Sequence, residues 1–308
     1  MDVTKYQGVI PAFYACYDDN GEISPERVEA FTRWLIKKGV KGVYVGGSSG
    51  ECIYHGVEER KTVLEHVVKA AEGKLTIIAH VACNNTRDSM ALAAHAESLG
   101  VDAIAAIPPI YFKLPEHAIA KYWNDISSAA PNTDFIIYNI PQLAGVALTL
   151  PLLREMLKNP KMIGVKNSSM PTMDIQVFKH EGTLGGRDFV VFNGPDEQFI
   201  SGLLIGADGG IGGTYSAMPE LYLKLVELLN NGEIETARKL QNDVNNIIYK
   251  LCSAKGNMYA VIKATLKKRE GLELGGVREP LANLVEADSV IVDEAVEMIN
   301  KAIETYIN

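Results

Sequence analysis

The chain alternates between short apolar runs and longer amphipathic stretches. The apolar runs are rich in β-branched residues and nearly continuous, which is typical of strands buried on both faces of a parallel sheet. Eight strands are predicted, at residues 8–17, 42–47, 76–82, 103–109, 134–140, 162–168, 189–194 and 209–214.

The stretches between the strands have helical spacing. Residues 25–39, 57–71 and 88–100 carry apolar side chains on one face and polar ones on the other, which predicts amphipathic helices. Each of these helices is expected to close at a glycine, the residue that best adopts a left-handed cap. These glycines are Gly39, Gly73 and Gly100.

Alternating strands and helices predict a parallel sheet with right-handed crossovers, in the α/β class. Eight such units over residues 8–232 fit a closed (β/α)8 TIM barrel. An open doubly wound sheet is the alternative. The chain lacks the G-x-G-x-x-G fingerprint typical of that fold, since GGIGGTY has Tyr215 where the last glycine belongs.

After residue 232 the alternation stops. Residues 233–254, 258–271 and 288–307 predict helices with no strands between them. We therefore expect a barrel domain over 1–232 and a C-terminal helical segment over 233–308. No Pro/Ser-rich linker separates them, so the segment should pack on the barrel.

Composition indicates an ordinary soluble globular protein, with 47% hydrophobic and 22% charged residues in 308. A net charge of −8 argues against a nucleic-acid partner, because no basic surplus is available to neutralise phosphates. No signal peptide and no apolar run of membrane-spanning length is present, so we expect a cytoplasmic protein without a membrane partner.

The sequence predicts neither a metal nor a cofactor. Its cysteines, Cys16, Cys52, Cys83 and Cys252, form no C-x-x-C motif and fit reduced thiols of the cytosol. His80 and His95 are expected in the core or on a helix surface, because no set of His, Asp and Glu has metal-ligand spacing.

Lys166 is the strongest candidate for chemistry. Active sites of barrels lie where the strands end, and the sixth predicted strand ends in Gly164-Val165-Lys166. Period-two alternation places Lys166 on the same side as Gly164 and opposite Ile163 and Val165, so it faces the barrel interior if those two β-branched residues face the helices. Partial burial favours the neutral, nucleophilic amine. A lysine that reaches solvent or pairs with a carboxylate is the alternative.

Tyr138 ends the fifth strand, next to the sixth in a barrel. Strands pair about 5 Å apart, so its phenol is expected beside Lys166, where it could relay a proton. A buried tyrosine with a satisfied hydroxyl is the alternative, and strand pairing alone does not decide between the two.

Two further strand ends suit a polar substrate. The second ends in Gly46-Gly47-Ser48-Ser49-Gly50-Glu51, whose backbone N–H groups and hydroxyls can form a cradle for a carboxylate. A flexible turn that caps the next helix is the alternative. Asp196 and Glu197 follow the seventh strand, where they either bind substrate hydroxyls or are favourable first-turn charges. The glycine-rich end of the eighth strand has no nearby Lys or Arg, so no phosphate is expected there.

At these residues the sequence resembles the N-acetylneuraminate lyase family, in the superfamily shared with dihydrodipicolinate synthase. The resemblance covers essentially the whole chain, through GGSSGE at 46–51, YNIP at 138–141, VKNS at 165–168, NGPDE at 193–197 and ADGGIGGTY at 207–215.

The resemblance implies a cofactor-free Schiff-base aldolase that converts sialic acid to N-acetylmannosamine and pyruvate. It assigns catalysis to Lys166 and Tyr138. It further implies a homotetramer, with Tyr111 near a subunit boundary and counted among the substrate-binding residues. The residues it implies for substrate binding are Ser48, Ser49 and the neighbouring Ser168 for the pyruvyl carboxylate, and Gly194, Asp196 and Glu197 for the sugar hydroxyls.

Two departures bear on specificity. Dihydrodipicolinate synthases usually carry an arginine shortly after the tyrosine, whereas Gln142-Leu143-Ala144 stand here. Lyases often have a serine where this chain has Gly213. The alternatives are therefore a 2-keto-3-deoxy sugar acid aldolase, a 4-hydroxy-tetrahydrodipicolinate synthase, or a barrel that senses keto acids without turnover.

Overall fold

The computed structural model describes residues 3–307. Eight parallel strands form a nearly closed barrel with helices between them, in the order β1-β8-β7-β6-β5-β4-β3-β2. The strands are β1 Gly8–Pro11, β2 Gly42–Val45, β3 Thr76–His80, β4 Ala103–Ala106, β5 Asp134–Asn139, β6 Met162–Asn167, β7 Val190–Asn193 and β8 Gly209–Gly212. All eight lie within the predicted runs, so the barrel is confirmed and the open sheet is wrong.

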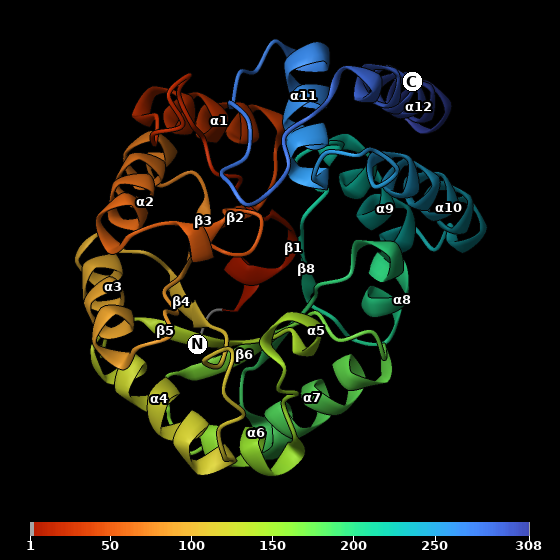
Figure 1. The fold of residues 1–308 in the computed structure, drawn as a ribbon. Helices are drawn as coiled ribbons and strands as arrows, with labels where there is room; N and C mark the ends of the chain where they lie inside the picture. Colours follow the sequence, from red (N-terminus) through yellow and green to blue (C-terminus); the bar gives the residue numbers. More distant parts are fainter. Residues whose placement is uncertain (1–2, 308) are drawn as a thin grey trace. The chain divides into compact units, whose positions relative to one another are not determined.

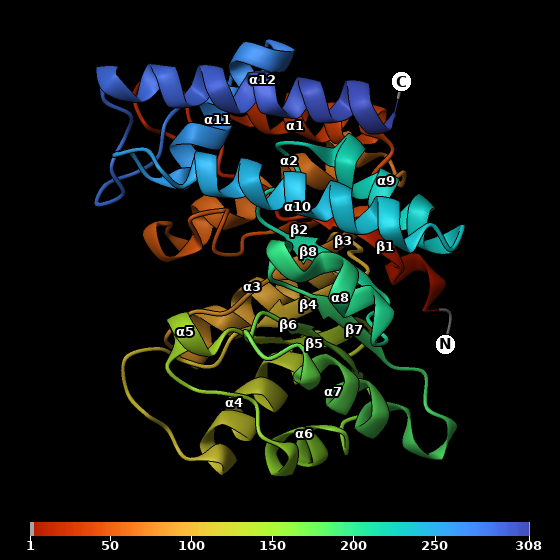
Figure 2. The same cartoon turned by 90° about the vertical axis from the view of Figure 1, so that its right-hand side faces the viewer.

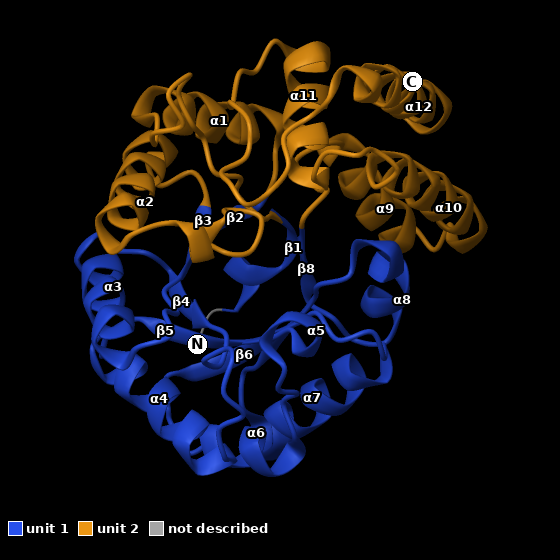
Figure 3. Ribbon diagram, viewed as in Figure 1, with its two compact units in different colours: residues 1–10, 41–45, 76–212 blue, residues 11–40, 46–75, 213–308 orange. Residues whose placement is uncertain are grey.

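The chain divides into two compact units, coloured in Figure 3. The first comprises Met1–Ile10, Lys41–Val45 and Thr76–Gly212, and the second comprises Pro11–Val40, Gly46–Leu75 and Gly213–Asn308. The predicted division at residue 232 stays a prediction.

The first unit contains the barrel interior. Its helices are α3 Thr86–Ser98, α4 Glu116–Ser128, α5 Pro141–Ala144, α6 Leu150–Met156, α7 Met173–Thr183 and α8 Phe199–Leu204. Figure 1 shows α3, α4, α6 and α7 on the outside of the strands of this unit. Inward side chains from every strand fill the centre, among them Ile78, Ile136 and Phe192. At the ends of the strand order, Lys41 N–H donates to the carbonyl of Val9 at 2.9 Å.

The second unit is helical. It contains α1 Pro25–Lys38, α2 Val57–Ala71, α9 Pro219–Asn230, α10 Ile234–Leu251, α11 Met258–Glu270 and α12 Ser289–Tyr306. The three predicted C-terminal helices are confirmed as α10 to α12, and α10 packs along α12 (Figure 2). Over residues 3–307, no helix is both long and apolar enough to cross a membrane.

Local signals explain where the helices begin and end. At α1, the Ser24 side chain accepts from Arg27 N–H at 3.3 Å, and Pro25 occupies the first turn. Gly39 caps the other end with φ 79°. Gly73 and Gly100 have φ 70° and 73° just beyond α2 and α3, although the cap positions themselves are Glu72 and Leu99.

Candidate active site

Lys166 and Tyr138 meet in the barrel interior. They are register partners on β6 and β5. Both side chains are buried, with 4% and 3% exposure, and Nζ of Lys166 lies 3.9 Å from the centre of the Tyr138 ring. The predicted proximity of the amine and the phenol is therefore confirmed, and the alternative of a lysine reaching solvent is wrong. Their catalytic roles stay predictions.

Gly164 pairs with Ile136 of β5 and Val190 of β7, which both belong to the interior core. Ile163 belongs to that core as well, so the expectation that it faces the helices is wrong; the register of β5 and β6 shifts at this point. A Cβ at Gly164 would lie 2.4 Å from Cγ2 and 2.5 Å from the carbonyl oxygen of Val190 on β7. The room that a glycine leaves here is thus used by the neighbouring strand. Only glycine permits β6 and β7 to pair this closely beside the lysine.

Tyr44 also lies against the amine, and the sequence did not identify it. The Tyr44 ring on β2 lies 4.1 Å from Lys166 Nζ, and its centre is 5.7 Å from that of Tyr138 at 79°. His80, buried as predicted, packs against both tyrosine rings at 6.0 and 6.1 Å. The sequence feature that could have identified Tyr44 is its position on the inward face near the end of β2.

A chain of buried amides fixes the ends of β5 and β6. The Asn139 amide donates to Asn167 Oδ1 at 2.7 Å, and the Asn167 amide donates to Ser169 Oγ at 2.9 Å. Ser169 in turn donates to Asp174 at 2.6 Å. Because Asn139 and Asn167 directly follow Tyr138 and Lys166, this chain holds the two strand ends in register.

Ser168 and Gly194 lie together at the ends of β6 and β7. Gly194 N–H donates to the carbonyl of Asn167 at 2.8 Å, and a Cβ on Gly194 would lie 2.0 Å from Ser168 Oγ. Asp196 and Glu197 follow in the short 3-10 helix Asp196–Gln198, where Asp196 is buried and Glu197 is exposed. Both acids are in the first turn, as predicted, and substrate contact stays a prediction.

Ser48 and Ser49 belong to the second unit, in a compact turn. Gly50 N–H donates to the carbonyl of Gly47 at 3.1 Å, and Glu51 N–H donates to that of Ser48 at 3.0 Å. Ser49 is 5% exposed. The next helix is the 3-10 helix Cys52–Tyr54, whose N-cap is Glu51, while α2 begins later with Gly56 as its N-cap. The turn that caps the next helix is therefore present, and its use as a carboxylate cradle stays a prediction.

Gly213 lies beside this turn in the second unit. A Cβ at Gly213 would be 3.4 Å from Ser49 Oγ, an ordinary contact distance. Tyr14 donates its hydroxyl proton to the carbonyl of Gly213. A serine would therefore fit at this position.

Glu51 ends the turn in a buried polar cluster. It pairs with Lys263 at 2.9 Å and accepts from the Tyr17 hydroxyl at 3.0 Å. Burial lowers the pKa of Lys263, while the carboxylate of Glu51 opposes that shift. Tyr17 Oη also lies 2.6 Å from His55 Nε2, and burial together with Arg278 lowers the pKa of His55 to about 4.

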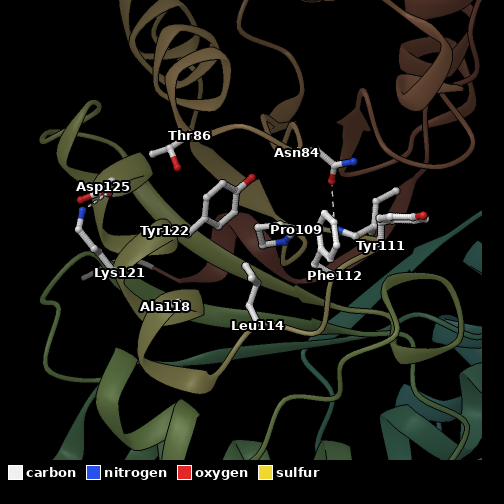
Figure 4. A pocket seen from close by; sticks show the side chains of 11 residues that line it. Asn84, Thr86, Pro109, Tyr111, Phe112, Leu114, Ala118, Lys121, Tyr122 and Asp125 are labelled. Carbon is white, nitrogen blue, oxygen red and sulfur yellow. Dashed lines mark hydrogen bonds and ion pairs between the residues drawn. The ribbon is translucent and has the colours of Figure 1, made fainter.

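Tyr111 lies on the surface and not in the barrel interior. It is 90% exposed at φ 86° and packs edge-on against Phe112, which is 72% exposed. The two rings border a pocket of about 580 Å³ between the segment after β4 and α4 (Figure 4). Asn84 accepts from Ile110 N–H at 2.9 Å and holds this segment.

The chain is a (β/α)8-barrel protein with a buried lysine at the end of β6. Comparison with known proteins gives its family. The chain belongs to the dihydrodipicolinate synthetase family, whose model matches residues 5–299. It is 68% identical to the N-acetylneuraminate lyase of Mediterraneibacter gnavus, over 99% of this chain and 96% of the relative. An Escherichia coli N-acetylneuraminate lyase is 37% identical, over 80% and 81% of the two chains.

Solved structures of similar chains support the same family. The wild-type sialic acid aldolase of Ruminococcus gnavus is 69% identical, with a TM-score of 0.96 over 98% of this chain and all (100%) of that one. A catalytic-lysine mutant of the same aldolase gives a TM-score of 0.97 over 99% of both chains, at 68% identity. The resemblance drawn from the sequence motifs is confirmed.

Proposed function

We propose that this chain is a lyase that cleaves N-acetylneuraminate to N-acetylmannosamine and pyruvate, reversibly, through a Schiff base on Lys166. The observation that carries the proposal is the buried Lys166 amine over the Tyr138 ring, in a chain 68% identical to an N-acetylneuraminate lyase. That a related aldolase has a catalytic lysine supports the same role here.

The reaction begins on the open-chain substrate. The neutral amine of Lys166 attacks the C2 ketone, and loss of water leaves an iminium. The C3–C4 bond then breaks, and its electrons move into the iminium to give an enamine. Tyr138, as the phenolate, takes the proton of the C4 hydroxyl, whose oxygen becomes the aldehyde oxygen of N-acetylmannosamine, and then passes that proton to C3 of the enamine, which restores the phenolate. Hydrolysis of the pyruvyl iminium releases pyruvate and the free amine.

The remaining residues bind the substrate in this proposal. Ser48 and Ser49 hold the carboxylate, with Ser168 as a further contact, so that attack on the ketone is effectively intramolecular. Gly194, Asp196 and Glu197 contact the sugar hydroxyls. The reaction as written needs no metal or cofactor.

We also propose a cytoplasmic homotetramer. All four cysteines are free thiols, which fits a reducing compartment. The exposed rings of Tyr111 and Phe112 suit a subunit boundary. Sedimentation of wild type and Tyr111→Ala tests the assembly, and a monomeric wild type would refute it.

Borohydride reduction in the presence of pyruvate tests the mechanism. Hydride converts the iminium to a stable secondary amine, so peptide mapping should find the pyruvyl adduct on Lys166. Lys263, also buried at 1% exposure, is an internal control that should stay unmodified. An unmodified Lys166 in active enzyme would refute the mechanism.

Substrate comparison separates the related activities. Pyruvate release from N-acetylneuraminate should far exceed release from 2-keto-3-deoxy sugar acids, and aspartate semialdehyde should not be consumed. Pyruvate binding without any turnover would instead support a sensor.

A further inference from the structure

The buried ion pair between Glu51 and Lys263 has no role in the reaction described above. The two side chains are 0% and 1% exposed, and 2.9 Å separates Oε1 from Nζ. Moving both charges out of water costs about as much as their attraction returns, and an apolar pair of similar volume is often at least as stable. Such a pair therefore calls for an explanation other than stability.

The Glu51 carboxylate is held from three separate segments. Lys263 reaches it from α11, the Tyr17 hydroxyl donates at 3.0 Å from the segment after β1, and Arg278 N–H donates at 2.8 Å from the loop after α11. Lys263 also donates to the carbonyl of Gly276 at 2.6 Å. The carboxylate is thus fixed in direction as well as in place.

The backbone of Glu51 closes the serine turn. Its φ of 52° is in the left-handed region, which is unfavourable for a residue with a Cβ. Its N–H donates to the carbonyl of Ser48 at 3.0 Å. A side chain anchored by three donors can hold this backbone conformation, and with it the direction of the Ser48 and Ser49 groups.

We propose that Glu51 and Lys263 are positioning residues of the carboxylate cradle, residues 46–51. The ion pair keeps the turn in the shape that receives the carboxylate of the keto acid. This inference rests on the proposed function, because it takes the cradle as the site of the substrate carboxylate. According to this inference, Lys263 affects how tightly the keto acid binds but not the rate at which Lys166 reacts with it.

The test is the rate of borohydride trapping of Lys166 as pyruvate is varied, in full-length wild type and Lys263→Met. The half-saturating pyruvate concentration should rise about 10- to 100-fold, the factor that one charged hydrogen bond represents. The trapping rate at saturation should stay unchanged. With hydroxyacetone, a ketone without a carboxylate, wild type and variant should be trapped equally.

Matched variants separate positioning from general damage. Lys38→Met removes another ion-paired lysine of the same unit, bonded to Glu220 and Glu270, and should leave the half-saturating concentration unchanged. Glu51→Gln keeps the shape and one acceptor, and should give an intermediate rise. If Lys263→Met does not fold, Tyr17→Phe removes one neutral donor and should raise the concentration about 2- to 10-fold.

The two possible failures are distinguishable. An unchanged half-saturating concentration in the folded variants, or an equal loss with hydroxyacetone, would overturn the inference while leaving the Schiff base intact. Absence of trapping on Lys166 in the wild type would overturn the proposed function itself.

Discussion

Gly164→Ala should impair both folding and catalysis, because the new methyl group has no space. It would lie 2.4 Å from Val190 Cγ2 and 2.5 Å from the Val190 carbonyl oxygen. Non-bonded carbons prefer about 3.5–4.0 Å, so β6 and β7 must separate by about 1 Å. Overpacking of this kind costs about 1–3 kcal/mol of the free energy of unfolding. A displacement of about 1 Å near Lys166, two residues further on, should lower kcat/KM about 100-fold.

Urea denaturation and pyruvate release measure the two effects. The double variant Gly164→Ala/Val190→Ala should recover only part of each loss, because it removes Cγ2 but leaves the carbonyl oxygen in place. Gly56→Ala is the control, since its Cβ would meet Glu59 Oε2 at 3.7 Å, a normal contact. Wild-type stability and kcat/KM in Gly164→Ala would refute the reasoning.

Three further outcomes are expected. Tyr138→Phe should lower kcat by at least about 100-fold while Lys166 is still trapped by borohydride with pyruvate, and loss of trapping would contradict a role in proton transfer alone. His55 has a pKa of about 4 in the folded protein, against 6.5 for an unperturbed histidine, so between these values the unfolded chain binds one more proton than the folded protein. The free energy of unfolding should therefore fall between pH 6.5 and pH 4, by at most about 3 kcal/mol. In urea titrations at several pH values, His55→Gln should reduce this pH dependence. Gly213→Ser should change the free energy of unfolding by no more than about 0.5 kcal/mol, since its Cβ meets Ser49 Oγ at 3.4 Å. It should change KM for N-acetylneuraminate. A large loss of stability would show that the position is tighter than described.

The barrel could be predicted because its signals are local. Each strand run and each helical stretch is visible within one short continuous piece of sequence, and helix ends such as Ser24 and Gly39 carry their own caps. Strand pairing between consecutive units then follows from the fold class. That is why the proximity of Tyr138 and Lys166 could be predicted from the sequence.

Contacts between distant segments could not be predicted in the same way. The partner of Glu51 is 212 residues away, and nothing near Lys263 in the sequence distinguishes it from an ordinary helix lysine. Tyr44 belongs to a strand that is not adjacent to that of Lys166, so its position over the amine depends on side-chain packing across the barrel. The exposure of Tyr111 likewise depends on the path of a loop.

The distribution of the lysine's neighbours has a consequence for how new specificities arise. The two rings over the amine, those of Tyr44 and Tyr138, come from β2 and β5, whose backbones are held by parallel pairing. Asp196 and Glu197, in contrast, stand in a short helix beyond the end of β7. Under the proposed function these two acids contact the sugar hydroxyls, so mutations there should alter which aldehyde is accepted without touching the nucleophile. Directed evolution of acceptor range should therefore begin in that segment and leave the strands unchanged.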